Sequence, residues 1–293
     1  MPPVVLDLDG SALGLASSTV IPLRDLEQRL RFACSRRALR DFARRLDAQL
    51  PELHGTVLTG SGDFHHLSLP LIRRAVARCG PLQVVVFDNH PDNMRFPFGV
   101  HCGSWVSRVC ALPGVRQVHV VGITSADIGR AHAWENQWWP LRRGRLGYWS
   151  CGVDTRWARR AGLAQAFHGF DDMPTLLAAF GEHMAATDGP IYLSIDKDVL
   201  SAGEARTNWD QGCMREVQLR AAIAALRGRI VASDITGEVS RVRYERLWKR
   251  LLSALDRQPT VPADVLAQWQ GAQRALNTRL LQAIDATGAP HAG

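Results

Sequence analysis

The segment 84–93 constrains the fold of this chain more strongly than any other. It places the apolar run Val84–Phe87 directly before an Asp-x-His-x-Asp cluster, formed by Asp88, His90 and Asp92. A short run of β-branched and aromatic residues predicts a buried strand of a parallel sheet. Ligands bind at the carboxyl ends of such strands in open α/β sheets, so we expect the cluster to line a ligand-binding crevice.

The composition of the cluster indicates a cation. Alternate residues of an extended chain face the same way, so Asp88, His90 and Asp92 can converge on one point. Carboxylates held that close repel one another unless a positive charge lies among them. A divalent metal ion is the simplest solution, and a polar loop without a ligand is the alternative interpretation.

A second strand end repeats this arrangement. The apolar run Ile191–Ile195 leads into Asp196-Lys197-Asp198, and the spacing places the two carboxylates on one side and Lys197 on the other. Together the two clusters contain more carboxylates than one ion requires. We therefore expect two ions that share bridging ligands.

A third strand end supplies an imidazole. The expected strand Thr56–Thr59 leads through a glycine-containing turn to His65 and His66, and glycine permits a tight strand-to-helix connection there. Histidines at such a turn can bind a metal, cap a helix or face solvent. Oxygen-rich ligation with one or two imidazoles suits manganese better than metals that prefer thiolates.

The remaining pattern predicts one α/β domain, residues 1–293, with a parallel sheet and helices on both of its faces. Further strands are expected at Val4–Leu8, Val118–Ile123 and Arg229–Ser233. Amphipathic helices are expected at residues 23–46, 67–79, 243–255 and 263–284. The last residues, 288–293, are expected to form a loose tail.

Charge and composition argue against several classes of protein. The net charge is +7, but the arginines are scattered among acids along the expected helices, which indicates solvated helical faces rather than a nucleic-acid-binding surface. No apolar run approaches the ~20 residues of a membrane span, and the amino terminus lacks the features of a secretory signal. The six cysteines include no Cys-x-x-Cys pair, so we expect reduced thiols in a cytoplasmic protein.

The amino-terminal run Asp7-Leu8-Asp9-Gly10-Ser11 allows a different function. It resembles the nucleophile loop of the haloacid-dehalogenase phosphatases, in which one Asp attacks phosphate and the second acts as acid and base. A first strand that ends in an Asp-Gly turn is the alternative interpretation.

The three strand ends, in their order along the chain, resemble the arginase/agmatinase family of ureohydrolases. Gly62-Asp63-Phe64-His65-His66 is similar to the first metal-binding signature of the family, Gly-Gly-Asp-His-Ser. The segments 88–92 and 194–198 are similar to the second and third, Asp-Ala-His-x-Asp and Ser-x-Asp-x-Asp. The resemblance implies a three-layer α/β/α fold and two manganese ions held by six ligands: His65, Asp88, His90, Asp92, Asp196 and Asp198.

Two further residues carry over from the family as candidate catalytic residues. His101, in His101-Cys102-Gly103, matches the His-Gly segment whose histidine shuttles a proton; a loop histidine is the alternative. Glu238 matches the glutamate of the late Asp-x-x-Glu-Val segment, with one extra residue before it. In the family this glutamate pairs with the substrate's guanidinium; a cap or surface acid is the alternative.

The chain also departs from the family pattern. Phe64 replaces the usual Asp of the first signature, and Ser201-Ala202 replaces the Asp-Pro that follows the third. The loop 207–212 differs from the Gly-rich loop of the family. These changes leave the expected metal ligands in place and leave the substrate open.

The resemblance therefore implies a binuclear manganese hydrolase that cleaves a carbon–nitrogen bond of a small guanidine or amidine, as arginase, agmatinase and formimidoylglutamase do. Arg95 is a candidate for holding a substrate carboxylate, with a solvent-facing arginine as the alternative. The rival functions are the phosphatase and a non-catalytic binding protein on the same fold. Family members commonly form trimers or hexamers, which suggests a homo-oligomer without nucleic-acid or membrane partners.

Overall fold

The computed structural model describes residues 1–242, 244–255 and 261–288. Within them, nine parallel strands form one central sheet in the order β2-β1-β4-β11-β10-β5-β7-β8-β9. The strands of this sheet are β1 (Val4–Asp7), β2 (Thr19–Pro22), β4 (Val57–Ser61), β5 (Leu82–Phe87), β7 (Val115–Ile123), β8 (Leu146–Cys151), β9 (Phe167–Phe170), β10 (Ile191–Asp196) and β11 (Ile230–Glu238). A separate antiparallel pair joins β3 (Ala33–Cys34) to β6 (Val100–His101).

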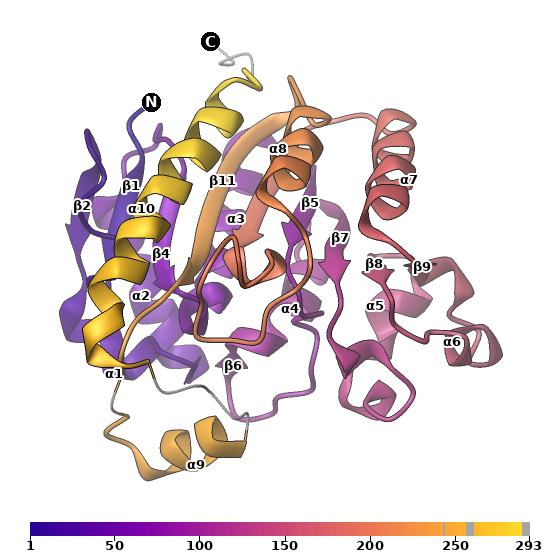
Figure 1. Ribbon diagram of the computed structural model, residues 1–293, viewed down its shortest axis with the longest axis horizontal. Helices are drawn as coiled ribbons and strands as arrows, with labels where there is room; N and C mark the ends of the chain where they lie inside the picture. Colours follow the sequence, from indigo (N-terminus) through magenta and orange to yellow (C-terminus); the bar gives the residue numbers. More distant parts are fainter. Residues whose placement is uncertain (243, 256–260, 289–293) are drawn as a thin grey trace.

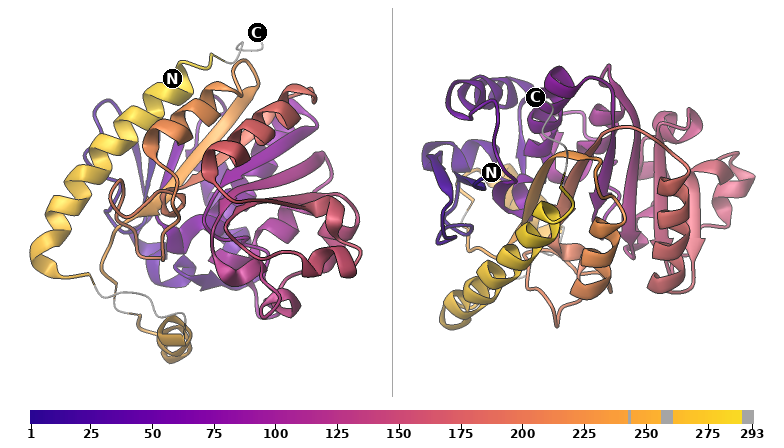
Figure 2. Two further views of the ribbon diagram at one scale, coloured as in Figure 1. Left: turned by 45° about the vertical axis from the view of Figure 1, so that its right-hand side comes forward. Right: turned by 90° about the horizontal axis from the view of Figure 1, so that it is seen from above.

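Helices cover both faces of the sheet, as Figure 2 shows from above. One face carries α1 (Glu27–Leu30), α2 (Arg36–Gln49), α3 (Ser68–Cys79), α4 (Val106–Cys110), α5 (Trp138–Arg142) and α6 (Trp157–Arg160). The other face carries α7 (Met173–Ala185), α8 (Glu216–Ala224) and α10 (Ala263–Asp285). The predicted α/β fold, with a parallel sheet between two helical layers, is confirmed.

The strand β5 illustrates why the sheet is apolar on both faces. All six of its residues are buried. Val84 and Val86 belong to the buried core on the side of α2, α3 and α4. Val85 and Phe87 belong to the core on the side of α7 and α8, where Phe87 contacts Phe180. Alternating side chains that are all apolar are what a strand with a helical layer on each face requires.

The helix α2 shows how the amphipathic pattern positions a covering helix. Ser35 begins it, with a side-chain oxygen that accepts a hydrogen bond from the Ala38 amide at 3.1 Å. Leu39, Phe42 and Leu46 follow at three- and four-residue steps and are buried against the sheet. The helix ends just before Pro51, which cannot continue it.

The boundaries differ from the expected ones at several places. β11 continues to Glu238, five residues beyond the expected end at Ser233, so Asp234 lies inside the strand rather than after it. The expected helix 243–255 begins only at Leu247. β2, β8 and β9 were not expected, because their sequences mix exposed, aromatic and glycine residues that carry no clear alternation. The expected tail lies outside the described residues, apart from Gly288.

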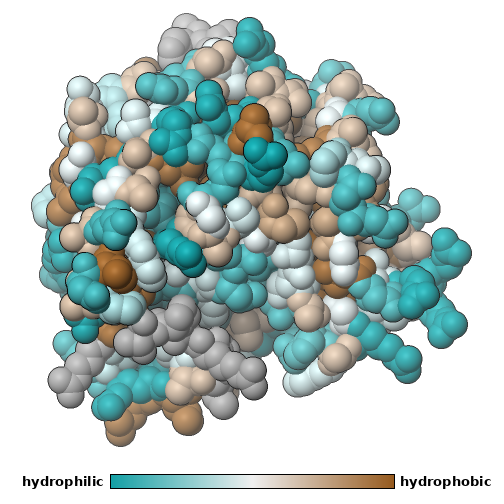
Figure 3. All heavy atoms as spheres, in the orientation of Figure 1, coloured by the Kyte–Doolittle hydropathy of each residue, from teal (hydrophilic) through white to brown (hydrophobic). Residues whose placement is uncertain are grey.

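The short helix α9 (Leu247–Leu255) lies apart from the two layers, at the lower edge of Figure 1. Leu247, Trp248 and Leu251 expose 77%, 41% and 64% of their surface, which makes this edge one of the more apolar parts of the face in Figure 3. Within the described residues, no helix combines the length and the apolar character that crossing a bilayer requires.

Candidate metal centre

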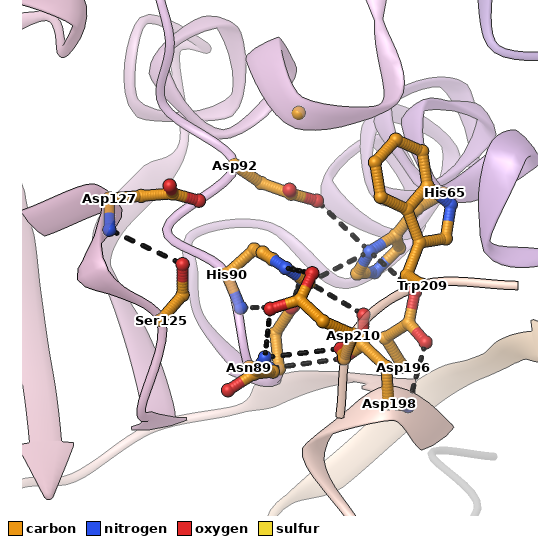
Figure 4. A network of polar contacts seen from close by, with 12 residues as sticks. His65, Asn89, His90, Asp92, Ser125, Asp127, Asp196, Asp198, Trp209 and Asp210 are labelled. Carbon is orange, nitrogen blue, oxygen red and sulfur yellow. Dashed lines mark hydrogen bonds and ion pairs between the residues drawn. The ribbon is translucent and has the colours of Figure 1, made fainter. Parts of the chain in front are cut away.

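The sheet order brings the predicted ligands to one place. β4, β11, β10 and β5 are neighbours in the sheet, so their carboxyl ends meet at one edge. His65 lies in the 3₁₀ helix after β4, and Asp88, His90 and Asp92 follow β5. Asp196 ends β10, and Asp198 lies in the 3₁₀ turn after it. All six side chains line one cavity, and Figure 4 shows the five other than Asp88 gathered there.

The six side chains form two groups that share Asp88. In the first, His65 Nδ1 lies 3.1 Å from Asp88 Oδ2, 3.0 Å from Asp92 Oδ2 and 3.4 Å from Asp196 Oδ2. In the second, His90 Nδ1 lies 3.0 Å from Asp198 Oδ2 and 3.6 Å from Asp88 Oδ1. The ligand atoms of His65, Asp88 and Asp196 lie within 4.8 Å of one another, and so do those of Asp88, His90 and Asp198. One carboxylate can therefore bridge two ions.

The hydrogen bonds around His65 point Nδ1, and not Nε2, toward the carboxylates of the site. Ser194 donates its hydroxyl proton to Asp234 at 2.7 Å. It must then accept the hydrogen bond from His65 Nε2, 3.0 Å away, so the neutral ring carries its proton on Nε2. Among the described residues, His65 Nδ1 and Asp88 Oδ2 are buried without a hydrogen-bond partner. The Asp88 and Asp92 carboxylates outweigh burial and raise the pKa of His65 well above its ordinary value, so Nδ1 holds a proton in the metal-free protein. A cation that displaced this proton would meet one imidazole nitrogen and three carboxylate oxygens.

The acids of the site have strongly shifted pKa values. Burial, and then the neighbouring Asp88 carboxylate, raises the pKa of Asp92 to about 7 and that of Asp198 to about 7. Burial and Asp198 raise the pKa of Asp196 well above its ordinary value. Four carboxylates share this volume with His65 and His90, whose pKa values they raise well above the ordinary value although burial lowers them. A bound cation would replace the protons on the two imidazoles as the positive charge among the acids. Divalent ions that prefer oxygen and imidazole ligands, such as manganese, fit this donor set.

The cavity in front of the six side chains has a volume of about 160 Å³. Its outer wall carries two further acids, Asp127 and Glu135, beside the apolar surfaces of Met94 and Trp209. In Figure 4 the Asp127 carboxylate points inward, toward Asp92. The volume admits a small molecule, and the outer acids favour one with a positive charge.

His101 lies in the cavity wall, as expected from its motif. Its Nδ1 accepts a hydrogen bond from the Gly103 amide at 2.9 Å, so the neutral ring carries its proton on Nε2. Burial and the Lys249 ammonium lower the pKa of His101 to about 3. The imidazole is therefore neutral at physiological pH.

Glu238 lies outside the cavity wall, so its contact with a substrate stays a prediction. Its side chain is 1% exposed and does not line the cavity. Lys197 Nζ donates to Glu238 Oε1 at 2.5 Å, and Asn277 donates to the same oxygen at 2.6 Å. The physical reason is the extra residue before it: Gly237, with φ +85°, forms a bulge in β11, and one inserted residue turns the next side chain to the other face.

Arg95 also lies outside the cavity. Its Nε donates to the Asn136 carbonyl at 3.1 Å, and the residues lining the cavity do not include it. The expected contact with a substrate carboxylate therefore has no support in this geometry.

No protein-family model matches the sequence. An uncharacterised protein from Thermotoga maritima is 29% identical over 204 residues, which are 68% of this chain and 63% of that protein. This chain therefore spans less than two thirds of the curated relative it matches.

Solved structures of ureohydrolases share the architecture. The arginase of Bacillus subtilis superposes with a TM-score of 0.58 at 15% identity, over 97% of this chain and 98% of that one. The formimidoylglutamase of Bacillus subtilis gives 0.55 at 15% identity, over 99% and 87%. The proclavaminate amidinohydrolase of Streptomyces clavuligerus gives 0.52 at 19% identity, over 86% and 70%.

The chain has the arginase fold. The resemblance inferred from the three strand-end motifs is thereby confirmed at the level of the fold, for a divergent sequence. Within the arginase fold, the departure at Phe64 does not reach the ligands: Phe64 is buried, with the Arg31 guanidinium 4.8 Å from its ring centroid.

Three residues that support the predicted ligands were not found from the sequence. Asp210 Oδ1 lies 2.9 Å from His90 Nε2, and Trp105 Nε1 donates to Asp92 Oδ2 at 2.6 Å. Ser194, which fixes the His65 tautomer, stands two residues before Asp196, so its alternate spacing was a usable signal. Asp210 is 120 positions from His90 in the chain, and Trp105 follows no pattern that links it to Asp92. Only the fold brings each of them to its partner.

Proposed function

We propose that this protein is a binuclear, manganese-dependent hydrolase of a carbon–nitrogen bond in a small guanidine or amidine. The observation that carries the proposal is the pair of histidine–carboxylate groups that share Asp88 at the strand ends of an arginase fold. His65, Asp88, Asp92 and Asp196 would hold one ion. His90 and Asp198, together with Asp88, would hold the other. Two such ions lower the pKa of a water molecule and so supply a hydroxide nucleophile at neutral pH.

His101 is the proposed proton carrier. It lines the cavity as a neutral ring whose proton is on Nε2, because the Gly103 amide occupies Nδ1. A neutral imidazole can donate that proton to a leaving amine and be reprotonated afterwards. The hydrogen bond from Gly103 keeps the ring in one orientation while it does so.

Substrate recognition is proposed to lie on the outer wall of the cavity. Glu238 is paired with Lys197 through Oε1 and does not line the cavity. Asp127 and Glu135 are the acids that face the cavity beyond the six predicted ligands. They would attract a cationic group on the substrate, with Trp209 as a flat apolar surface beside it. A homo-oligomer and a cytoplasmic location stay predictions.

The test is a panel of guanidines, amidines and formimidoyl compounds incubated with the manganese-loaded protein, with released urea or ammonia measured. Asp92→Asn and Asp198→Asn should each lower bound manganese and reduce turnover at least 100-fold, as expected when a ligand oxygen is lost from a site that generates the nucleophile. Turnover that survived in both variants would contradict the proposed roles.

The phosphatase alternative has little support from the geometry. Arg24 Nε pairs with Asp7 Oδ1 at 2.7 Å, and Arg31 Nη2 pairs with Asp9 Oδ2 at 2.6 Å. Asp7→Asn should therefore leave turnover on the panel unchanged. Loss of a phosphatase activity in that variant would favour the alternative, and two bound ions without turnover on any compound would favour a binding protein.

A further inference from the structure

Lysine is rare in this chain, and both copies are buried. Lys197 and Lys249 are the only lysines among 35 basic residues, and each is 0% exposed. A chain that uses arginine everywhere else retains lysine at two interior positions. A lysine ammonium is a compact point charge with three donors, unlike the planar fork of an arginine.

Lys197 stands between two predicted metal ligands and points away from them. Asp196 and Asp198 face the cavity, while the Lys197 ammonium donates to Glu238 Oε1 at 2.5 Å and to Asn277 Oδ1 at 2.9 Å. Asn277 also donates to Glu238 Oε1 at 2.6 Å. The three side chains form a closed triangle, and each is at most 1% exposed.

This triangle joins three elements behind the metal centre. Lys197 belongs to the turn after β10, Glu238 ends β11, and Asn277 lies on α10. The fit beneath the turn is tight: a Cβ on Gly237 would collide with Asp196 Oδ1 and lie 2.7 Å from the Lys197 amide. The turn therefore has little space on the side of β11, and the ammonium links it to Glu238 and Asn277.

The opposite side of the turn is held independently. The Asn89 amide donates to Asp198 Oδ1 at 3.1 Å, and the Gly212 amide donates to the Asp198 carbonyl at 2.7 Å. Asp196 belongs to the first ligand group and Asp198 to the second. Any movement of the residue between them displaces a ligand of each group.

We propose that Lys197 is a positioning residue of the metal centre, which holds Asp196 and Asp198 in register for two ions by tying their turn to Glu238 and Asn277. The inference rests on the proposed function only for the presence of the ions. It assigns Glu238 to the support of the centre, in place of contact with a substrate.

The test compares Lys197→Met with Lys249→Met. Lys249 is an equally buried ammonium, whose Nζ donates to the Gln28 and Arg31 carbonyls at 2.9 and 2.6 Å. It anchors α9 to the end of α1, and neither element supplies a predicted ligand. Both variants lose a buried charge, so both should unfold at a lower temperature. Only Lys197→Met should disturb the turn after β10 that carries Asp196 and Asp198.

Manganese binding is measured by calorimetric titration, and cobalt(II) absorption reports the ligand geometry of each variant. We expect Lys197→Met to lower the affinity for both ions about 10- to 100-fold, the range for residues that orient metal ligands. The cobalt absorption bands should also shift. In the metal-free protein, amides 196–199 should exchange with deuterium faster in this variant. Lys249→Met should leave all three readouts as in the wild type.

A double variant, Lys197→Met with Glu238→Leu, separates positioning from charge burial. Replacing a buried ion pair by apolar residues often restores stability. The thermal midpoint should recover while metal affinity stays low, because the tether to the turn is still lost. Recovery of affinity together with stability would overturn the proposal, and so would wild-type affinity in Lys197→Met or equal losses in both lysine variants.

Different results would refute the proposed function and the role of Lys197. A wild-type protein that binds two ions but releases no urea or ammonia from any compound would refute the hydrolase and leave the role of Lys197 intact. Turnover by the wild type, with unchanged manganese affinity in Lys197→Met, would support the hydrolase and refute the role of Lys197. A wild type that bound no divalent ion would overturn both.

Discussion

Asp210 and Glu238 are both acids close to the predicted metal centre, and the fold gives them opposite places. Asp210 lies on an exposed loop, with 71% of its side chain accessible, yet it contacts His90 Nε2 at 2.9 Å. Glu238 belongs to a segment similar to a family motif and is sealed behind the centre by Lys197. A carboxylate on the far nitrogen of a ligating histidine fixes the ring and strengthens its other nitrogen as a ligand. The residue without a motif is therefore the one that supports a ligand directly.

We predict that Asp210→Ala weakens manganese binding. Loss of the acceptor frees the His90 ring to rotate, so manganese affinity should fall about 10-fold at the site that includes His90. Calorimetric titration at constant pH measures the change. The control is Asp154→Ala, which removes another exposed aspartate, paired with Arg156 at 2.8 Å, and should bind manganese as the wild type does. An unchanged affinity in Asp210→Ala would contradict the role.

The bulge at Gly237 is the feature of β11 that decides how the element meets the metal centre. Its φ of +85° is available to glycine at little cost. A side chain there would meet Asp196 Oδ1. The bulge lets β11 pass close to the turn that carries Asp196 and Asp198. It also directs the Glu238 side chain toward Lys197 and α10.

The prediction for this element compares Gly237→Ala with Gly228→Ala. Gly228 has a similar φ, +76°, with open space where a Cβ would lie. Gly228→Ala should lower the free energy of unfolding by about 1–2 kcal/mol, because alanine disfavours the left-handed conformation. Gly237→Ala adds a collision with backbone and a ligand, so it should lose more stability in urea unfolding and also weaken manganese binding. Equal losses in the two variants would show that the bulge is not tightly packed.

For the molecule as a whole, a cluster of histidines near the far edge of the sheet makes stability depend on pH. His119, His168 and His183 lie around Trp149, with the His119 and His183 rings 5.1 Å apart. Burial, followed by the charges of His183, His168 and Arg229, lowers the pKa of His119 to about 3. The folded pKa then lies below the unfolded value of about 6.5. The unfolded chain binds more protons, so stability decreases as the pH falls from about 6.5 toward 3.

The variant His119→Phe should reduce this acid sensitivity. Between pH 7 and pH 5 the wild-type histidine contributes about 2 kcal/mol to the loss of unfolding free energy, by the linkage between pKa and stability. Urea unfolding at both values measures the difference, which should shrink by about that amount in His119→Phe. His132→Phe, at a more exposed histidine, is the control and should keep the wild-type pH dependence. If both variants lose stability in acid as the wild type does, burial of His119 is not the cause.

Local sequence was sufficient for the features that depend on local pattern. Val84–Phe87 and Ile191–Ile195 predict buried strands because both faces are apolar, and acids two residues apart converge because extended chain alternates its sides. The α/β class follows from those strands together with the amphipathic helices between them. These conclusions need no knowledge of which segments are neighbours.

Tertiary structure decided what depends on neighbours distant in sequence. The register of β11 against β4 shifts twice near its end, and one inserted glycine reverses the side on which Glu238 emerges. Asp210 meets His90 across 120 positions of chain. Lys197 finds Glu238 and Asn277 only because α10 packs behind β11. Spacing within a segment is local geometry, whereas register between segments results from packing of the whole chain, and on that register depends which acids face the cavity.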